Sequence, residues 1–174
     1  DLQSESRLRA ILAAMTATVP AHPPLLVKLA PDLPDAGLRA VIETCRAVGV
    51  AGLIMTNTTP DRPAGLRAAA AREAGGLSGA PLFRRATAAL ARARLMAGDT
   101  LTLVGVGGVA SGADALAKLQ AGASLVQLYT ALVFAGPGLV GRINAELAAA
   151  LAAAGFAGPA AATGTDAERI AGWS

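Results

Sequence analysis

The residues best placed to bind a ligand follow short apolar segments of the sequence. Lys28 lies inside the first segment, where its ammonium group needs either an acceptor or a path to water. The second segment runs into Thr56-Asn57-Thr58-Thr59, whose amide and hydroxyl groups suit a planar imide or carboxylate. Residues of these types also form ordinary turns, so the two segments indicate a ligand site without identifying the ligand.

Two further segments end in groups that suit a phosphate. Gly107-Gly108 lies between a predicted strand and a predicted helix, where backbone N–H groups can face an anion. Tyr129-Thr130 ends the next predicted strand and would complete such a cradle. A pair of glycines also serves in any tight turn. The run from Gly105 does not fit the dinucleotide-binding pattern G-x-G-x-x-G, because position 110 is alanine, which disfavours a Rossmann site.

The elements that must position these residues alternate between short strands and longer helices. Alternation of this kind predicts an α/β fold with parallel strands. A closed eight-stranded barrel typically needs about 250 residues, whereas this chain has 174. Periodicity therefore leaves two alternatives, a small open sheet or part of a (β/α)8 barrel. The predicted strands are 25–30, 52–56, 100–106 and 124–129, and the predicted helices are 38–48, 81–96, 111–120 and 137–154.

Composition narrows the class of protein. The chain is 53% hydrophobic, but much of this is alanine, and we find no apolar run of the roughly 18–20 residues that a spanning helix needs. With a net charge of +3 and 3% aromatic residues, it offers little for nucleic-acid binding. Cys45 is the single cysteine and His22 the single histidine, so we expect neither an internal disulfide nor a metal site. Cys45 is predicted to pack in the core.

Several ordered motifs together resemble the class 2, quinone-dependent dihydroorotate dehydrogenases. They occur in family order and spacing over roughly residues 24–155. The resemblance implies a (β/α)8 TIM barrel of which this chain holds only the last four βα units. The motifs are Val27-Lys28-Leu29-Ala30-Pro31-Asp32-Leu33, Thr56-Asn57-Thr58-Thr59, Gly75-Gly76-Leu77-Ser78-Gly79-Ala80-Pro81-Leu82, Gly105-Val106-Gly107-Gly108-Val109 and Gly122-Ala123-Ser124-Leu125-Val126-Gln127-Leu128-Tyr129-Thr130.

The same resemblance implies one domain and a set of site residues. Residues 1–174 would be the C-terminal half of an FMN-binding barrel, with 1–23 as a helix and connection before the fifth strand and 155–174 as a C-terminal tail. The sequence itself predicts that this tail is flexible, with a short helix near residues 166–170. The implied contacts are Lys28, Thr56 and Gly79 for the flavin ring, Gly108, Tyr129 and Thr130 for the FMN phosphate, and Asn57 and Thr58 for dihydroorotate or orotate.

The implied reaction is the FMN-dependent oxidation of (S)-dihydroorotate to orotate, with a quinone as electron acceptor, in pyrimidine biosynthesis. The class 2 base is a serine in the first half of the barrel, so we expect it upstream of Asp1 and expect no catalytic residue in this chain. The quinone site and the membrane-contacting segment are expected there too, in a parent protein bound peripherally at the cytoplasmic face of the membrane. We therefore expect the chain alone to be inactive, and to self-associate through its open sheet edges.

Two other interpretations remain open on the sequence. One is another FMN-binding or phosphate-binding TIM-barrel enzyme, which explains the glycine pair better than it explains Thr56-Asn57-Thr58-Thr59. The other is a non-catalytic binding domain with a small α/β sheet, which gives no reason for Lys28 in an apolar strand.

Overall fold

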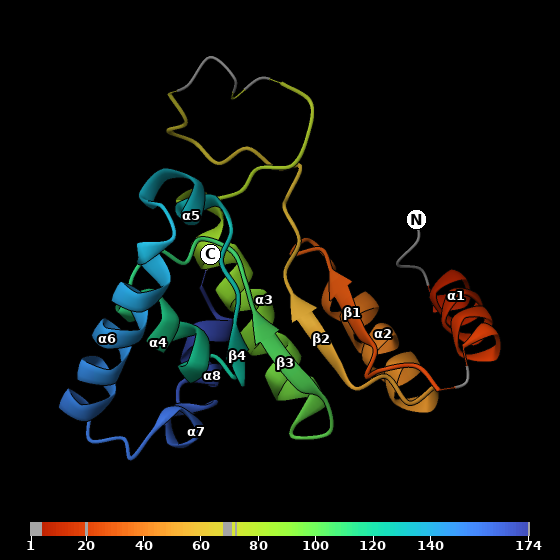
Figure 1. Ribbon diagram of the computed structural model, residues 1–174. Helices are drawn as coiled ribbons and strands as arrows, with labels where there is room; N and C mark the ends of the chain where they lie inside the picture. Colours follow the sequence, from red (N-terminus) through yellow and green to blue (C-terminus); the bar gives the residue numbers. More distant parts are fainter. Residues whose placement is uncertain (1–4, 20, 68–70, 72, 174) are drawn as a thin grey trace.

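The computed structural model describes residues 5–19, 21–67, 71 and 73–173, in which four parallel strands alternate with helices (Figure 1). The long connection between the second strand and the third helix extends beyond the strand ends. The elements are α1 (Glu5–Thr18), β1 (Leu26–Leu29), α2 (Asp35–Ala47), β2 (Gly52–Met55), the 3-10 helix η2 (Ala80–Leu82), α3 (Phe83–Ala97), β3 (Thr102–Gly105), α4 (Gly112–Gln120), β4 (Leu125–Val126), α5 (Thr130–Ala135), α6 (Gly138–Ala153), α7 (Pro159–Ala162) and α8 (Ala167–Ala171).

The sheet has the order β1-β2-β3-β4, with every neighbouring pair parallel. Lys28 is in register with Ile54, and Ile54 with Val104. The carboxyl ends of all four strands consequently lie on the same side of the sheet, next to the long connection and α5 in Figure 1. Among the described residues, β1 and β4 each pair with one strand, so both are edge strands.

The two faces of the sheet differ in burial. Leu29 and Leu53 are fully buried, and they pack in a core with residues of α1, α2 and α3. Side chains alternate between faces along a strand, so Lys28, Leu26 and Leu125 lie on the other face. There Leu26 is 40% and Leu125 60% exposed. The apolar runs had predicted buried strands, and that prediction holds for the helix-covered face, whereas the other face is buried at Val104 of β3, which is 4% exposed, and open at the edge strands.

The structure corrects three predicted elements. The strands are shorter than predicted, and β4 contains only Leu125–Val126. Thr130 does not end a strand but begins α5, a helix that we did not predict. The final segment is not a flexible tail. Its short helix, predicted near residues 166–170, is present as α8, and Ile170 is fully buried against the core.

Contacts of Trp173 show why this segment is ordered. Its ring lies 6.3 Å from that of Phe83, at the start of α3. The guanidinium groups of Arg84 and Arg169 lie 5.1 and 5.6 Å from the same ring, within the range of cation–π attraction. The end of the chain is thereby packed against the helix that follows the long connection.

Three local features complete the fold. Ser111 caps α4 as predicted, because its hydroxyl oxygen accepts a hydrogen bond from the Asp114 N–H over 3.1 Å. Cys45 lies in the core as predicted, and burial raises the pKa of its thiol to about 11. In the described part of the chain, no helix combines the length and apolar character needed to cross a membrane.

Candidate functional site

A cavity of about 640 Å³ lies at the carboxyl ends of the strands, which is where barrel enzymes carry their active sites. Its volume is within the range of small-molecule and cofactor sites. All eight residues that the sequence assigned to ligand binding line it, although they come from five separate parts of the chain. They are Lys28, Thr56, Asn57, Thr58, Gly79, Gly108, Tyr129 and Thr130.

Lys28 reaches this cavity because of the strand alternation described above. Its neighbours Val27 and Leu29 point toward the helix-covered core, and Leu29 is fully buried there. Lys28 itself is exposed and lines the cavity. An ammonium group at this position can interact with an electron-rich or anionic ligand in the cavity.

The segment after β2 is held by main-chain hydrogen bonds from both neighbouring strands. The Asn57 N–H donates to the Leu29 carbonyl over 2.7 Å, and the Thr56 N–H donates to the Val106 carbonyl over 3.3 Å. The Asn57 side-chain oxygen accepts from the Thr58 N–H over 2.9 Å. Thr56 is 2% exposed, whereas Asn57 and Thr58 are exposed. Their polar side chains are therefore presented on a firmly anchored backbone.

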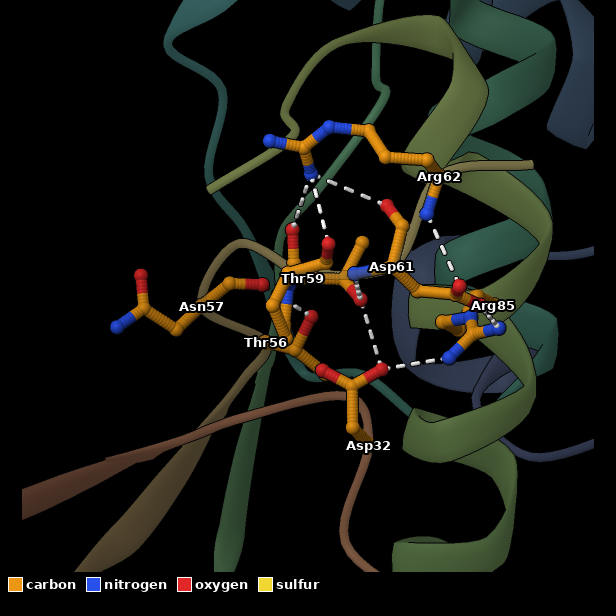
Figure 2. Close-up of polar contacts among 8 residues, drawn as sticks. Asp32, Thr56, Asn57, Thr59, Asp61, Arg62 and Arg85 are labelled. Atoms are coloured by element: carbon orange, nitrogen blue, oxygen red, sulfur yellow. Dashed lines mark hydrogen bonds and ion pairs between the residues drawn. The ribbon is translucent and has the colours of Figure 1, made fainter. Parts of the chain in front are cut away.

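An ion-pair network behind this segment joins the loop after β1, the long connection and α3 (Figure 2). The Thr59 hydroxyl donates to Asp32 over 2.8 Å, and Arg85 donates to the same carboxylate over 2.6 Å. Arg85 also pairs with Asp61, whose N–H donates to the Thr59 hydroxyl over 3.0 Å. The network fixes the segment that follows Asn57 relative to the loop after β1 and to α3.

Arg62 closes the long connection through hydrogen bonds to main-chain carbonyl groups, of which Figure 2 shows those of Thr59 and Asp61. Its guanidinium donates to Ala71 over 3.0 Å, and to Glu73 and Gly75 over 2.9 Å each. It also donates to Pro60, over 2.9 Å. The N–H of Leu77 donates to the Thr59 carbonyl over 2.7 Å, so the two limbs of the connection meet at its base. Nothing in the residue pattern had indicated this arrangement.

Replacing Arg62 with lysine is expected to loosen the connection, because one ammonium group cannot reach carbonyl groups arranged around a planar guanidinium. Losing several charge-assisted hydrogen bonds, partly exposed to water, should cost about 1–2 kcal/mol of local stability. Amide hydrogen exchange in residues 57–64 and 73–79 should accelerate by about tenfold or more. The control is Arg67→Lys, at an exposed arginine of the same connection. Equal exchange in the two variants would contradict the assigned role of Arg62.

The far end of the long connection contacts the start of α5. The Thr130 hydroxyl donates to that of Ser78 over 3.0 Å. A Cβ atom on Gly79 would lie 3.2 Å from the Thr130 side chain, and Gly79 has a φ of +76° that favours glycine. The glycine-rich segment and the segment after β4 therefore form one continuous wall of the cavity.

The turn after β3 has the properties of a phosphate cradle. Gly107 and Gly108 adopt φ values of +105° and +75°. A Cβ atom on Gly108 would lie 2.7 Å from the Phe83 Cα atom, so the turn packs directly on α3. Within the described part of the chain, the N–H groups of Gly107, Gly108 and Thr130 donate no hydrogen bond. Unpaired N–H donors at a glycine turn fit a phosphate group, so the cavity fits a flavin that carries one.

Several cavity residues were not predicted from the sequence. Ser78 lies within a quoted motif, and its position beside Gly79 could have identified it; Gly107 had already been indicated, with Gly108, as part of a phosphate-binding turn. The others belong to apolar or basic stretches without a distinguishing pattern, and α5 itself was missed. These further lining residues include Leu82, Val106, Leu128, Phe134, Leu139 and Arg142.

Known proteins resemble the chain in both sequence and structure. A family model described as dihydroorotate dehydrogenase matches residues 1–151. The dihydroorotate dehydrogenase (quinone) of Azorhizobium caulinodans is 54% identical over 172 residues, which cover 95% of this chain and 48% of that protein. The mitochondrial dihydroorotate dehydrogenase (quinone) of Mus musculus is 44% identical, with 97% of this chain and 44% of that protein covered.

The structural match agrees with the sequence match. A crystal structure of DHODH from Eimeria tenella in complex with ferulenol superposes with a TM-score of 0.90 at 33% identity, covering 95% of this chain and 49% of that one. The chain thus spans about half the length of the relatives it matches. Its four βα units form part of a (β/α)8 barrel, and the chain belongs to the dihydroorotate dehydrogenase family.

Proposed function

We propose that this chain supplies the flavin site and part of the substrate site of an enzyme that oxidises (S)-dihydroorotate to orotate, with a quinone as electron acceptor, in pyrimidine biosynthesis. One observation carries the proposal: the eight residues selected from five separate segments line one cavity. A non-catalytic open-sheet domain gives no reason for that convergence, and the family match disfavours other phosphate-binding barrels.

The family implies a flavin cofactor, and we propose that it is FMN. The unpaired N–H groups of Gly108 and Thr130 would hold its phosphate. Tyr129 is the N-cap residue of α5, the helix that begins at Thr130. Lys28, Thr56 and Gly79 would contact the ring. When bound, the flavin would accept the electrons released by the substrate.

Asn57 and Thr58 are proposed to bind the substrate ring. Both are exposed in the cavity, and the Asn57 side-chain amide retains donors for a ring carbonyl or carboxylate. The backbone hydrogen bonds of this segment and the network of Asp32, Thr59 and Arg85 hold both residues in place. Such positioning lowers the entropy lost when substrate and cofactor meet.

The remaining functions are proposed to lie in another part of the barrel. These functions are the serine base that removes the substrate proton, the quinone site and the contact with the cytoplasmic face of a membrane. Further strands would pair with the edge strands β1 and β4, and closing the barrel would cover the open face, on which Leu26 and Leu125 are exposed. The same exposed edges would lead the isolated chain to self-associate.

The test compares the isolated chain with a fusion in which the N-terminal half of the Azorhizobium caulinodans relative precedes Asp1. The fusion should be yellow, orotate should perturb its flavin spectrum, and it should reduce a soluble quinone analogue with dihydroorotate. We expect the isolated chain to show no turnover. A fusion that binds no flavin would refute the function, and turnover by the isolated chain at about 1 s⁻¹ or more would refute the assignment of the base elsewhere.

A further inference from the structure

Lys118 is a buried lysine beside the turn that contains Gly107 and Gly108. Its side chain extends from α4 and is 0% exposed. The Nζ atom donates to the Val106 carbonyl over 3.3 Å and lies 5.0 Å from the centre of the Phe83 ring. Burying an ammonium group is costly, and an apolar side chain of similar length would fill the space at lower cost. The position therefore calls for a role beyond packing.

The hydrogen bond from Lys118 determines the direction of the next peptide N–H group. In a planar trans peptide, the carbonyl of Val106 and the N–H of Gly107 point in opposite directions. Because Lys118 binds that carbonyl from inside the protein, the Gly107 N–H must face away from the interior, on the side of the cavity that Gly107 lines. The same carbonyl accepts from the Thr56 N–H, so one oxygen atom connects the flavin-ring and phosphate ends of the cavity.

Phe83 connects Lys118 to the second glycine of the turn. Its ring contacts the ammonium group, and its Cα atom would lie 2.7 Å from a Cβ atom on Gly108. The two glycines are therefore supported from below by one cation and one aromatic ring. Neither Lys118 nor Phe83 lines the cavity itself, so any influence on a ligand passes through the turn.

We propose that Lys118 is a positioning residue for the phosphate of the flavin, an inference that rests on the proposed FMN site. Through the Val106 carbonyl it turns the Gly107 N–H toward the phosphate, and its ammonium group places a positive charge behind that phosphate. The phosphate is thus bound from the front by N–H groups and attracted from behind by a buried cation.

The charge state of Lys118 should respond to the phosphate. Burial lowers the pKa of Lys118 to about 7, and the Asp114 carboxylate of its own helix opposes this shift. Lys118 also contacts the Val106 carbonyl, just after β3, and the Phe83 ring of α3. On two other elements packed against α4, Arg94 of α3 pairs with Asp99, and Glu146 of α6 pairs with Arg142 and accepts from the Gly112 N–H. A bound phosphate dianion should therefore raise the pKa of Lys118 and cause it to take up a proton.

The experiment is calorimetric titration of FMN and of riboflavin at pH 8, in buffers of different ionisation enthalpy. The isolated chain and the fusion are both used, and either one that binds FMN serves. At pH 8 Lys118 is mostly neutral in the free protein and the FMN phosphate is already a dianion. FMN binding should take up about 0.5 proton or more, and riboflavin, which lacks the phosphate, should take up none. Equal proton uptake with the two flavins would overturn the inference without any variant.

The variant Lys118→Met provides the second readout. It should remove the proton uptake and reduce the preference for FMN over riboflavin by about ten- to a hundredfold. Between pH 7 and 9 the preference of the unsubstituted protein should fall as Lys118 loses its proton, whereas that of the variant should stay constant. Riboflavin affinity reports whether the cavity still forms. An unchanged FMN preference would refute the role of Lys118, while failure of the unsubstituted protein to bind either flavin would refute the proposed function instead.

Discussion

Replacing Gly108 with alanine is expected to weaken FMN binding by about one to two orders of magnitude. The new methyl group would lie 2.6–2.9 Å from the Cβ, Cα and N atoms of Phe83. Two of these are backbone atoms, so neither partner can yield without moving the turn or the start of α3. Overpacking of this kind costs about 1–3 kcal/mol, and the N–H groups of the turn would be displaced from the phosphate. Equilibrium titration with FMN, followed by flavin fluorescence, measures the effect.

The matched control is Gly49→Ala. Gly49 has the same φ of +75°, but a Cβ atom there would meet nothing within 4 Å. Both variants therefore carry the backbone strain of alanine at positive φ, about 1–2 kcal/mol. Of the two, the Gly108 variant alone also brings a methyl group into collision with Phe83. Equal losses of FMN affinity in the two variants would mean that the turn does not bind the phosphate.

Replacing Lys28 with glutamine is expected to slow flavin reduction by dihydroorotate about 10²- to 10³-fold in the fusion, as for the loss of one preorganised stabilising group in other enzymes. Lys28 lies on the open face of the sheet and lines the cavity, where it can stabilise negative charge that develops on the flavin ring. FMN should still bind, because the phosphate cradle is built from other strands. Stopped-flow absorbance of the flavin separates the rate from the binding.

Two further variants make this result specific. Lys28→Arg keeps the positive charge and should recover part of the rate. Arg39→Gln removes an equal charge from an exposed position on α2 and should leave the rate within about twofold, because charges beyond a Debye length are screened. A Lys28→Gln rate close to that of the unsubstituted protein would exclude an electrostatic role for Lys28.

The sequence predicted best those features that depend on regular spacing. Parallel strands form continuous apolar runs, and chemistry collects at their carboxyl ends. Lys28, Asn57 and Gly108 could therefore be assigned to one cavity before the structure was known. The predicted strands were too long, because the apolar runs continue past the paired residues: Leu101, Val106 and Leu128 lie outside the strands. Helix α5 was missed because Thr130 follows an apolar segment directly. In addition, the six residues of α5 are too few for a recognisable helical period.

Other features depend on contacts that have no sequence signature. Arg62 looked like one more scattered arginine, and its acceptors are carbonyl oxygens that every residue possesses. Lys118 occupies an ordinary position on a predicted helix, and its burial follows only from packing, because α4 packs on α3 and β4 and the Lys118 Cβ atom faces Gly105 of β3. The final segment was predicted to be a flexible tail because most of its residues are small and give no recognisable packing pattern. Trp173 is the exception, since its large ring contacts that of Phe83.

The hydrogen bonds of Arg62 have a consequence for how the long connection can diverge. The guanidinium contacts main-chain oxygen atoms of Ala71, Glu73 and Gly75, and none of these bonds uses a side chain of the acceptor residue. Substitutions at these positions keep the acceptor, since every amino acid, proline included, retains its carbonyl group. The shape of this limb is thus specified largely by a single arginine, so related proteins could exchange the amino acids at positions 71 and 73 while preserving the geometry of the cavity beneath it, whereas position 75, with a φ of +134°, favours glycine.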